Sequence, residues 1–207
     1  MSSHSRLRYV LAVGALVVVA VVAPSTANAG ALAADAKNCE SQSFSQPFMP
    51  WADPASYTLQ PGGDFEPGSP AWDLTTGAAD AAVNEPWTVT DEYDGHSLAL
   101  TAGSSATSPS ICVGIEHPDI RFFARASSTL ATLKVEVLFL GANGDAQSLT
   151  IGTVTGSTGW SPTLQMPIVA NLLPLLPGSK TSVAFRLTAA SGTWKVDDFY
   201  VDPYARW

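Results

Sequence analysis

The chain has 207 residues, with 10 Lys and Arg against 18 Asp and Glu, and a formal net charge of −8. Nucleic acid and anionic membranes are bound through a surface rich in Lys and Arg, so this composition argues against both as partners. It suits a soluble extracellular protein, and it also suits one that binds cations.

The first 29 residues have the organisation of an export signal. Arg6 and Arg8 precede an apolar run over Tyr9–Ala23, and Ala27–Ala29 supplies small residues where a signal peptidase cuts. The alternative is an uncleaved membrane anchor, but this run is shorter than the about 20 residues that a bilayer core requires. We therefore expect cleavage after Ala29, a secreted product and no membrane insertion of the mature chain.

The mature chain is expected to hold a flexible stub over residues 30–43 and one domain over residues 44–207. Its two cysteines, Cys39 and Cys112, are predicted to form a disulfide, because paired thiols in an oxidising compartment usually do. Neither has Cys or His neighbours at zinc-ligand spacing. Closing so long a loop would stabilise the fold by about 4 kcal/mol in the chain-entropy model and attach the N-terminal arm.

The arm itself, Phe44–Tyr57, contains four aromatic residues and three prolines. Closely spaced prolines exclude a regular helix, whereas the aromatic side chains favour burial. We expect an irregular, extended arm lying across the rest of the domain.

The remainder of the chain reads as short segments rich in β-branched and aromatic residues, separated by turns. Residues 142–145 (Ala-Asn-Gly-Asp) predict a hairpin. The alternation of apolar and polar residues over 133–137 predicts a strand with one face exposed to solvent. The pattern indicates an all-β fold, a β-sandwich (jelly roll) of about 8–10 antiparallel strands with an irregular aromatic N-terminal arm. The predicted strands are Gly77–Val83, Ser97–Thr101, Ser110–Ile115, Ile120–Ala126, Thr132–Leu140, Ser148–Val154, Thr181–Thr188 and Trp194–Val201.

One apolar stretch, Pro167–Pro177, fits neither a helix nor a central strand because of its prolines. Two interpretations stay open for it. It is either a loop that caps the core or an exposed apolar patch for a partner.

No pattern in the sequence predicts catalysis. His96 and His117, the two histidines after the export signal, both lie in turn-like contexts, and no nucleophile elbow, phosphate loop or zinc motif is present. A pair of carboxylates could hydrolyse glycosidic bonds, but sequence spacing does not identify such a pair. We expect a protein that is not an enzyme.

Two segments at opposite ends of the domain's sequence bear a family resemblance. Residues 62–66 (Gly-Gly-Asp-Phe-Glu), followed by Trp72 and Gly77, resemble the opening of galactose-binding-like jelly-roll domains, and Trp194–Val201 resembles their closing strand. The likeness is greatest to the carbohydrate-binding modules of xylanases and glucanases.

In that family a structural calcium ion often ties the first strand to the last. The resemblance implies Glu66 and either Asp197 or Asp198 as ligands, with Asp64 as a further neighbour. Adjacent residues of a strand point to opposite faces, so only one of the two aspartates should reach the ion unless a bulge intervenes. The alternative is that these carboxylates face solvent or pair with Arg or Lys.

The resemblance also implies sugar binding through exposed aromatic faces. Trp72 and Trp194 match positions that pack inside, so the candidate ligand-binding residues are Trp87, Tyr93 and Trp160, with structural packing as the alternative for each. We expect a secreted, monomeric, non-catalytic binding module for a glycan or another cell-envelope component. The alternative is a structural or protein-interaction domain of the cell envelope with no sugar ligand.

Overall fold

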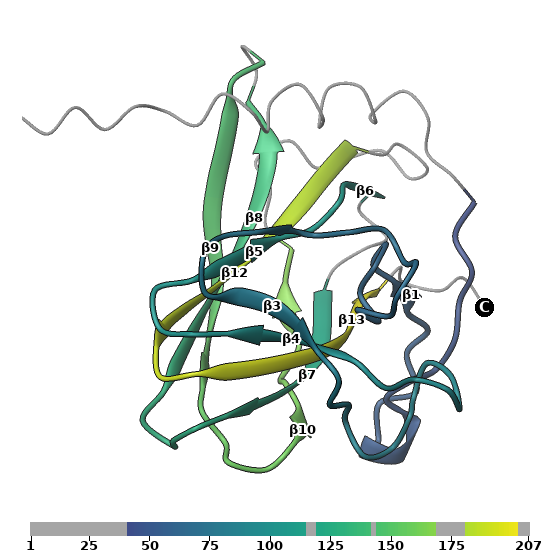
Figure 1. The fold of residues 1–207 in the computed structure, drawn as a ribbon. Coiled ribbons are helices and arrows are strands. Elements are labelled where there is room, and N and C mark those ends of the chain that lie inside the picture. The colour runs from purple at the N-terminus through teal and green to yellow at the C-terminus, as the bar shows by residue number, and fades with distance from the viewer. Residues whose placement is uncertain (1–40, 115–118, 142–143, 169–180, 203–207) are drawn as a thin grey trace, which may run out of the picture.

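The computed structural model describes residues 41–114, 119–141, 144–168 and 181–202. These residues form thirteen β-strands and one 3-10 turn, without any α-helix. Two antiparallel sheets make up a sandwich (Figure 1), which confirms the predicted all-β class. None of the helical segments in the described ranges is long and apolar enough to cross a membrane.

The first sheet has the order β10–β7–β13–β4–β3, with β1 paired to β13 and β11 paired to β7. The chain's last strand therefore lies in the middle of this sheet. Its members are β1 (Thr58–Leu59), β3 (Ala78–Ala81), β4 (Ser97–Leu100), β7 (Asp119–Ala126), β10 (Ser161–Pro162), β11 (Met166–Pro167) and β13 (Trp194–Asp202).

The second sheet has the order β2–β5–β12–β8–β9, with β6 also paired to β12. Strands β8 and β9, which flank the predicted hairpin at residues 142–145, pair antiparallel along their whole length, while residues 142–143 lie outside the described ranges. The members of this sheet are β2 (Asp73–Leu74), β5 (Ser105–Thr107), β6 (Ile111–Val113), β8 (Thr132–Leu140), β9 (Ala146–Thr155) and β12 (Thr181–Ser191).

All eight segments predicted as strands overlap a strand of the structure. The five strands that sequence reasoning missed, β1, β2, β5, β10 and β11, have only two or three residues each. A segment so short has no measurable alternation of apolar and polar residues, and its pairing is decided by tertiary contacts.

The main core fills the space between the two sheets. Phe122 and Phe199 stack at 5.2 Å between ring centroids, and Phe199 also contacts Phe185 of the opposite sheet at 5.2 Å. Trp72 and Trp194 are both buried in this core, as predicted.

The N-terminal arm covers part of the outer face of the first sheet. Phe48 and Tyr57 of the arm are fully buried against Phe123 of β7 and Tyr200 of β13. Strand β7 is therefore buried on both faces, because Phe122 points into the main core and Phe123 points toward the arm.

The arm differs from the prediction in one detail. It contains a single 3-10 turn, Met49–Trp51, with Pro50 at its start. Proline is tolerated in a first helical turn because the N–H that it lacks has no intrahelical partner there.

A buried ion pair fixes the arm to the sheet. Arg121 Nη1 of β7 donates to Asp53 Oδ2 at 2.6 Å, and Tyr57 Oη donates to the same oxygen at 2.7 Å. Arg121 Nε donates to the carbonyl of Thr163 at 2.7 Å. The arm is thus an integral part of the domain.

Several predictions fall outside the described residues: the export signal, Cys39, His117 and most of the Pro167–Pro177 stretch. Cys112 is buried in β6, and Gln42 Nε2 donates to its carbonyl at 2.9 Å. The chain three residues after Cys39 therefore lies beside Cys112, while the disulfide stays a prediction.

Candidate functional site

The two motifs that carry the family resemblance meet in the structure. Phe199 of β13 donates its N–H to the carbonyl of Gly63 at 2.9 Å, and its own carbonyl accepts from the N–H of Gln60 at 2.9 Å. A Cβ atom on Gly63 would lie 2.7 Å from the carbonyl oxygen of Phe199, so this close backbone approach requires glycine.

Strand β13 is irregular at this meeting point. Between Asp197 and Tyr200 it contains one residue more than its partner β7, which is the signature of a β-bulge. Asp198 has a φ of 50°, a left-handed conformation that Asp tolerates better than most residues. Because of the bulge, Asp197 and Asp198 both make contacts with the same loop, the one over residues 84–94.

This loop, called here the 84–94 loop, is closed at its two ends. Asn84 Nδ2 donates to the carbonyl of Asp94 at 3.0 Å, and the Glu85 carboxylate accepts from the N–H groups of Trp87 and Val89 at 2.5 and 2.8 Å. A loop of this length with adjacent ends is a compact Ω-type loop, a class that is frequently functional.

Three buried carboxylates converge where the loop meets β13. One carboxylate oxygen from each of Glu85, Asp94 and Asp198 lies within 4.8 Å of the others. Both oxygens of Asp94, Oδ2 of Asp198 and the side-chain oxygen of Asn84 are buried and accept no hydrogen bond from the described residues. Buried oxygens left without donors are costly, and a cation bound at this point would relieve that cost.

The pKa values of the buried carboxyl groups show that ionising them in this place is unfavourable. Burial first, and then the neighbouring carboxylates, raise the pKa of Asp94 to about 8. Burial raises the pKa of Asp198 to about 7, with Glu85 and Asp64 contributing repulsion. For Asp197, burial and the adjacent Asp198 raise the pKa to about 10. A cation in this group would lower all three, because it stabilises the ionised forms.

Glu66 lies at the edge of the group and is ionised. Its carboxylate accepts from the N–H groups of Gly95 and His96 at 2.6 and 2.7 Å and lies 3.0 Å from His96 Nδ1. Partial burial opposes ionisation, but these hydrogen bonds prevail and lower the pKa of Glu66 to about 2. His96 is thus a hydrogen-bonded loop residue, as its sequence context indicated.

The other predicted ligands have distinct positions. Asp198 belongs to the converging group, and its Oδ1 accepts from Thr90 Oγ1 of the loop. Asp197 accepts from the N–H groups of Glu85 and Asp198 at 3.1 and 3.0 Å, so it anchors the loop. Asp64 accepts from Ser69 Oγ at 2.9 Å within its own turn.

This donor set fits a calcium ion. Calcium prefers six to eight oxygen ligands drawn from carboxylates, amide side chains and backbone carbonyls. The group consists of the carboxylates of Glu85, Asp94 and Asp198, without a Cys or His among its members. The buried amide oxygen of Asn84 belongs to a residue that is hydrogen-bonded to Asp94. Among the residues that the structure describes, no Lys or Arg forms an ion pair with these carboxylates.

Sequence reasoning missed Glu85 and Asp94 as candidate ligands. Both lie in segments that it treated as turns near candidate aromatic residues. The available signal was an acidic residue at each end of one aromatic loop, but nothing in the sequence shows that those two ends close onto β13.

The candidate ligand-binding aromatics differ in their exposure. Tyr93 is 83% exposed and Trp87 is 44% exposed, and both belong to the 84–94 loop. The Trp87 ring contacts Trp51 of the arm edge-on at 4.8 Å and Phe123 at 5.6 Å, so it is held in place while part of it faces solvent.

Trp160 is half-buried and packs against the same aromatic cluster of the arm and β7. The structure therefore brings Trp87 and Trp160 onto one outer face of the first sheet. No ring contact joins Tyr93 to either tryptophan in the described ranges.

Neither a protein-family model nor a curated protein sequence matches the chain. Solved structures do match its fold. The xylan-binding domain CBM22-1 of Xyn10C from Paenibacillus barcinonensis is 18% identical with a TM-score of 0.43, over 66% of this chain and 88% of that one.

The family 11 carbohydrate-binding module of cellulase Lic26A-Cel5E from Clostridium thermocellum is 11% identical with a TM-score of 0.41, over 71% of this chain and 94% of that one. The CBM22-1–GH10 modules of C. thermocellum xylanase 10B are 13% identical with a TM-score of 0.46, over 72% of this chain and 27% of that one. The resemblance to carbohydrate-binding modules is a resemblance of fold.

Proposed function

We propose that this chain is a secreted, non-catalytic binding module that binds a glycan on the aromatic surface formed by Trp87, Tyr93 and Trp160. We further propose that a structural calcium ion, held by Glu85, Asp94 and Asp198, stiffens the loop that presents two of these residues. The observation that supports both statements is the position of Trp87 and Tyr93 between the two acidic ends of the 84–94 loop.

The aromatic surface has the properties that sugar binding requires. A pyranose ring packs its apolar C–H face against an aromatic ring, whose face is electron-rich. The indole of Trp87 is fixed by Trp51 and Phe123, so binding would not have to immobilise it. Preorganisation of this kind raises affinity because less conformational entropy is lost.

The calcium ion would supply charge compensation at the base of the loop. The loop's contacts with β13 include one hydrogen bond from Glu85 to Asp197 and one from Thr90 to Asp198. The carboxylates that surround these contacts repel one another. Compensating that repulsion would hold the loop, and with it Trp87 and Tyr93, in one conformation.

The alternative of protein docking through the aromatic arm receives less support. Phe48 and Tyr57 are fully buried in the domain, which leaves Phe44 and Met49 as the exposed large apolar residues of the arm. These two residues are a small surface compared with what a stable protein interface buries.

The test is a glycan array probed with the mature chain in calcium, followed by calorimetry on the polysaccharides that bind. Tyr93→Ala should abolish or weaken binding at least tenfold without changing the unfolding temperature, because Tyr93 is largely exposed. Phe44→Ala, which removes another exposed aromatic side chain, is the matched control and should bind normally. A folded protein that binds no glycan, or binding lost with Phe44→Ala alone, would refute the proposal.

A further inference from the structure

Two basic side chains have no acidic partner among the residues that the structure describes. The described ranges contain five Lys and Arg residues, and three of them form ion pairs: Arg121 with Asp53, and Lys134 and Arg186 with Glu136. The other two, Arg125 of β7 and Lys195 of β13, form no ion pair and no hydrogen bond through their side chains among the described residues.

These two unpaired cations face each other across the sheet. Lys195 is the direct cross-strand partner of Arg125 on one side and of Ala99 on the other. Like charges directly opposite each other destabilise a sheet. Partial burial, and next the charge of Arg125, lower the pKa of Lys195. The repulsion within this pair is therefore a cost to folding that an anion bound between the two side chains would offset.

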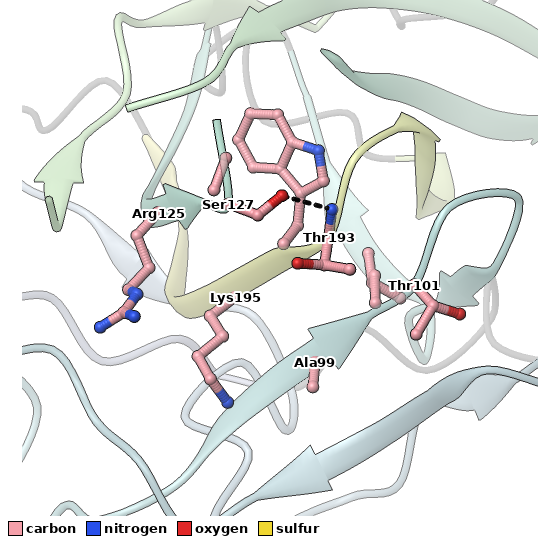
Figure 2. Close-up of a pocket in the computed structure, with 9 residues that line it drawn as sticks. Ala99, Thr101, Arg125, Ser127, Thr193 and Lys195 are labelled. Carbon is pink, nitrogen blue, oxygen red and sulfur yellow. Dashed lines mark hydrogen bonds between the residues drawn. The ribbon is translucent and has the colours of Figure 1, made fainter. Parts of the chain in front are cut away.

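A pocket of about 230 Å³ lies at the pair. Figure 2 shows the side chains of Arg125 and Lys195 reaching to the same side of the sheet, with Ala99 beside them on β4. The small side chain of Ala99 leaves space next to Lys195. The Thr193 N–H donates to Ser127 Oγ at 3.1 Å, and both residues line the pocket together with Thr101.

The pocket adjoins the proposed aromatic surface. The guanidinium of Arg125 lies over the ring of Trp160, 6.0 Å from its centroid. Phe123, which supports Trp87, is on the same face of β7 two residues away, a distance of about 7 Å along a strand. A saccharide chain that rests on the aromatic rings could therefore place a neighbouring unit at Arg125 and Lys195.

We propose that Arg125 and Lys195 bind the carboxylate of an acidic sugar unit, so that the glycan recognised by the aromatic surface contains uronic acid. This inference rests on the proposed glycan-binding function and specifies its ligand class. The guanidinium fork of Arg matches a carboxylate with two parallel hydrogen bonds, and Lys adds a second charge-assisted donor. The mainly apolar lining suits the C–H face of a sugar ring.

The negative net charge of the chain argues against a continuous polyanion as the ligand. With a net charge of −8, the rest of the surface would repel nucleic acid or a densely charged polymer. An isolated carboxylate on a saccharide would interact mainly with the nearby positive charges of Arg125 and Lys195.

The test compares an otherwise neutral oligosaccharide that carries one uronic acid unit with the same oligosaccharide after reduction of its carboxyl group. Calorimetry on the full mature chain in calcium should give at least tenfold tighter binding of the acidic form. Arg125→Gln and Lys195→Gln should each remove most of that preference, so that the acidic and reduced forms bind with nearly equal affinity. Lys134→Gln, which removes an ion-paired lysine on the other sheet, is the matched control and should retain the preference.

Three outcomes would overturn the inference. Equal affinity for the acidic and reduced forms refutes it and leaves the glycan-binding proposal intact. Tighter binding of a sulfated oligosaccharide than of the uronate shows a different anion specificity. Binding of neither form excludes the acidic ligand, and the array of neutral glycans then decides separately whether the module binds glycans at all. An unchanged unfolding temperature in both Gln variants verifies that they are folded.

Discussion

The backbone N–H of Glu85 donates a 3.1 Å hydrogen bond to Asp197 Oδ2, although 112 residues separate the two in sequence. This contact attaches the 84–94 loop to the last strand beside the converging carboxylates of Glu85, Asp94 and Asp198. The loop is thus held by hydrogen bonds and opposed by carboxylate repulsion. A divalent cation is the partner that would convert the repulsion into attraction.

Calcium is expected to stabilise the native protein strongly. A ligand that binds only the native state, present at a hundred times its dissociation constant, adds about 2.7 kcal/mol. For a domain of this size that corresponds to a rise of about 5–10 °C in the unfolding temperature. Differential scanning calorimetry in calcium and then in EDTA measures it.

Asp94→Asn should remove most of this calcium effect, because it deletes a ligand charge from the group. Asp80→Asn, which changes an exposed aspartate on β3, is the matched control and should keep the full effect. An identical unfolding temperature in calcium and EDTA for the wild-type chain would contradict the calcium assignment.

The metal-free protein should lose stability as the pH rises. The pKa values of Asp94 and Asp198 are raised to about 8 and about 7 in the folded state, well above the ordinary value of 3.8. The folded state therefore binds more protons than the unfolded state between these limits, so the free energy of unfolding falls as the pH increases from about 4 to about 8. Calcium, which binds the ionised carboxylates, should remove this fall.

Urea unfolding in EDTA at pH 5 and pH 8 measures the effect directly. The midpoint should be lower at pH 8 in EDTA, and the two midpoints should converge when calcium is added. A metal-free protein that becomes more stable from pH 5 to pH 8 would show that the carboxylates are compensated by some other group.

The sequence predicted the sandwich because long strands such as β8 and β7 carry their own evidence in β-branched and aromatic residues. The family resemblance implied that a calcium ion connects the opening and closing motifs; the structure places these motifs in contact through the backbone of Gly63 and Phe199, while the ion stays a prediction. Two features were beyond its reach. The bulge at Asp198 is a matter of register with β7, and the convergence of Glu85 and Asp94 depends on the closure of a loop by Asn84. Neither relationship is local in sequence.

Removing one partner of the buried ion pair in the arm should be costly. Asp53 accepts from both Arg121 and Tyr57, so Asp53→Ala leaves a buried guanidinium without its counter-ion. Loss of one partner of such a pair typically costs about 3–5 kcal/mol. The double variant Asp53→Ala/Arg121→Leu should lose less than the sum of the two single variants. Additive losses in urea unfolding would show that the pair contributes no coupling.

The predicted disulfide between Cys39 and Cys112 can be tested by mass. The unreduced mature chain should weigh two hydrogens less than the reduced chain and should not react with a thiol reagent after denaturation. The double variant Cys39→Ser/Cys112→Ser should lose about 4 kcal/mol of unfolding free energy. Two reactive thiols in the denatured, unreduced protein would contradict the prediction.

Calcium and glycan affinity should be coupled through the 84–94 loop. Glu85 and Asp94 stand at the two ends of the loop, with Trp87 and Tyr93 between them. If the ion fixes the loop, its removal releases conformational freedom that glycan binding must then restrict, so the affinity for glycan should fall about tenfold in EDTA.

Asp94→Asn should bind glycan weakly even in calcium, whereas Asp80→Asn should respond to EDTA as the wild type does. By reciprocity, the glycan must raise the affinity for calcium by the same factor, which a calcium titration with and without glycan measures independently. An affinity for glycan that EDTA leaves unchanged while the unfolding temperature falls, together with a calcium affinity that glycan leaves unchanged, would separate the ion from the aromatic surface and limit its role to stability.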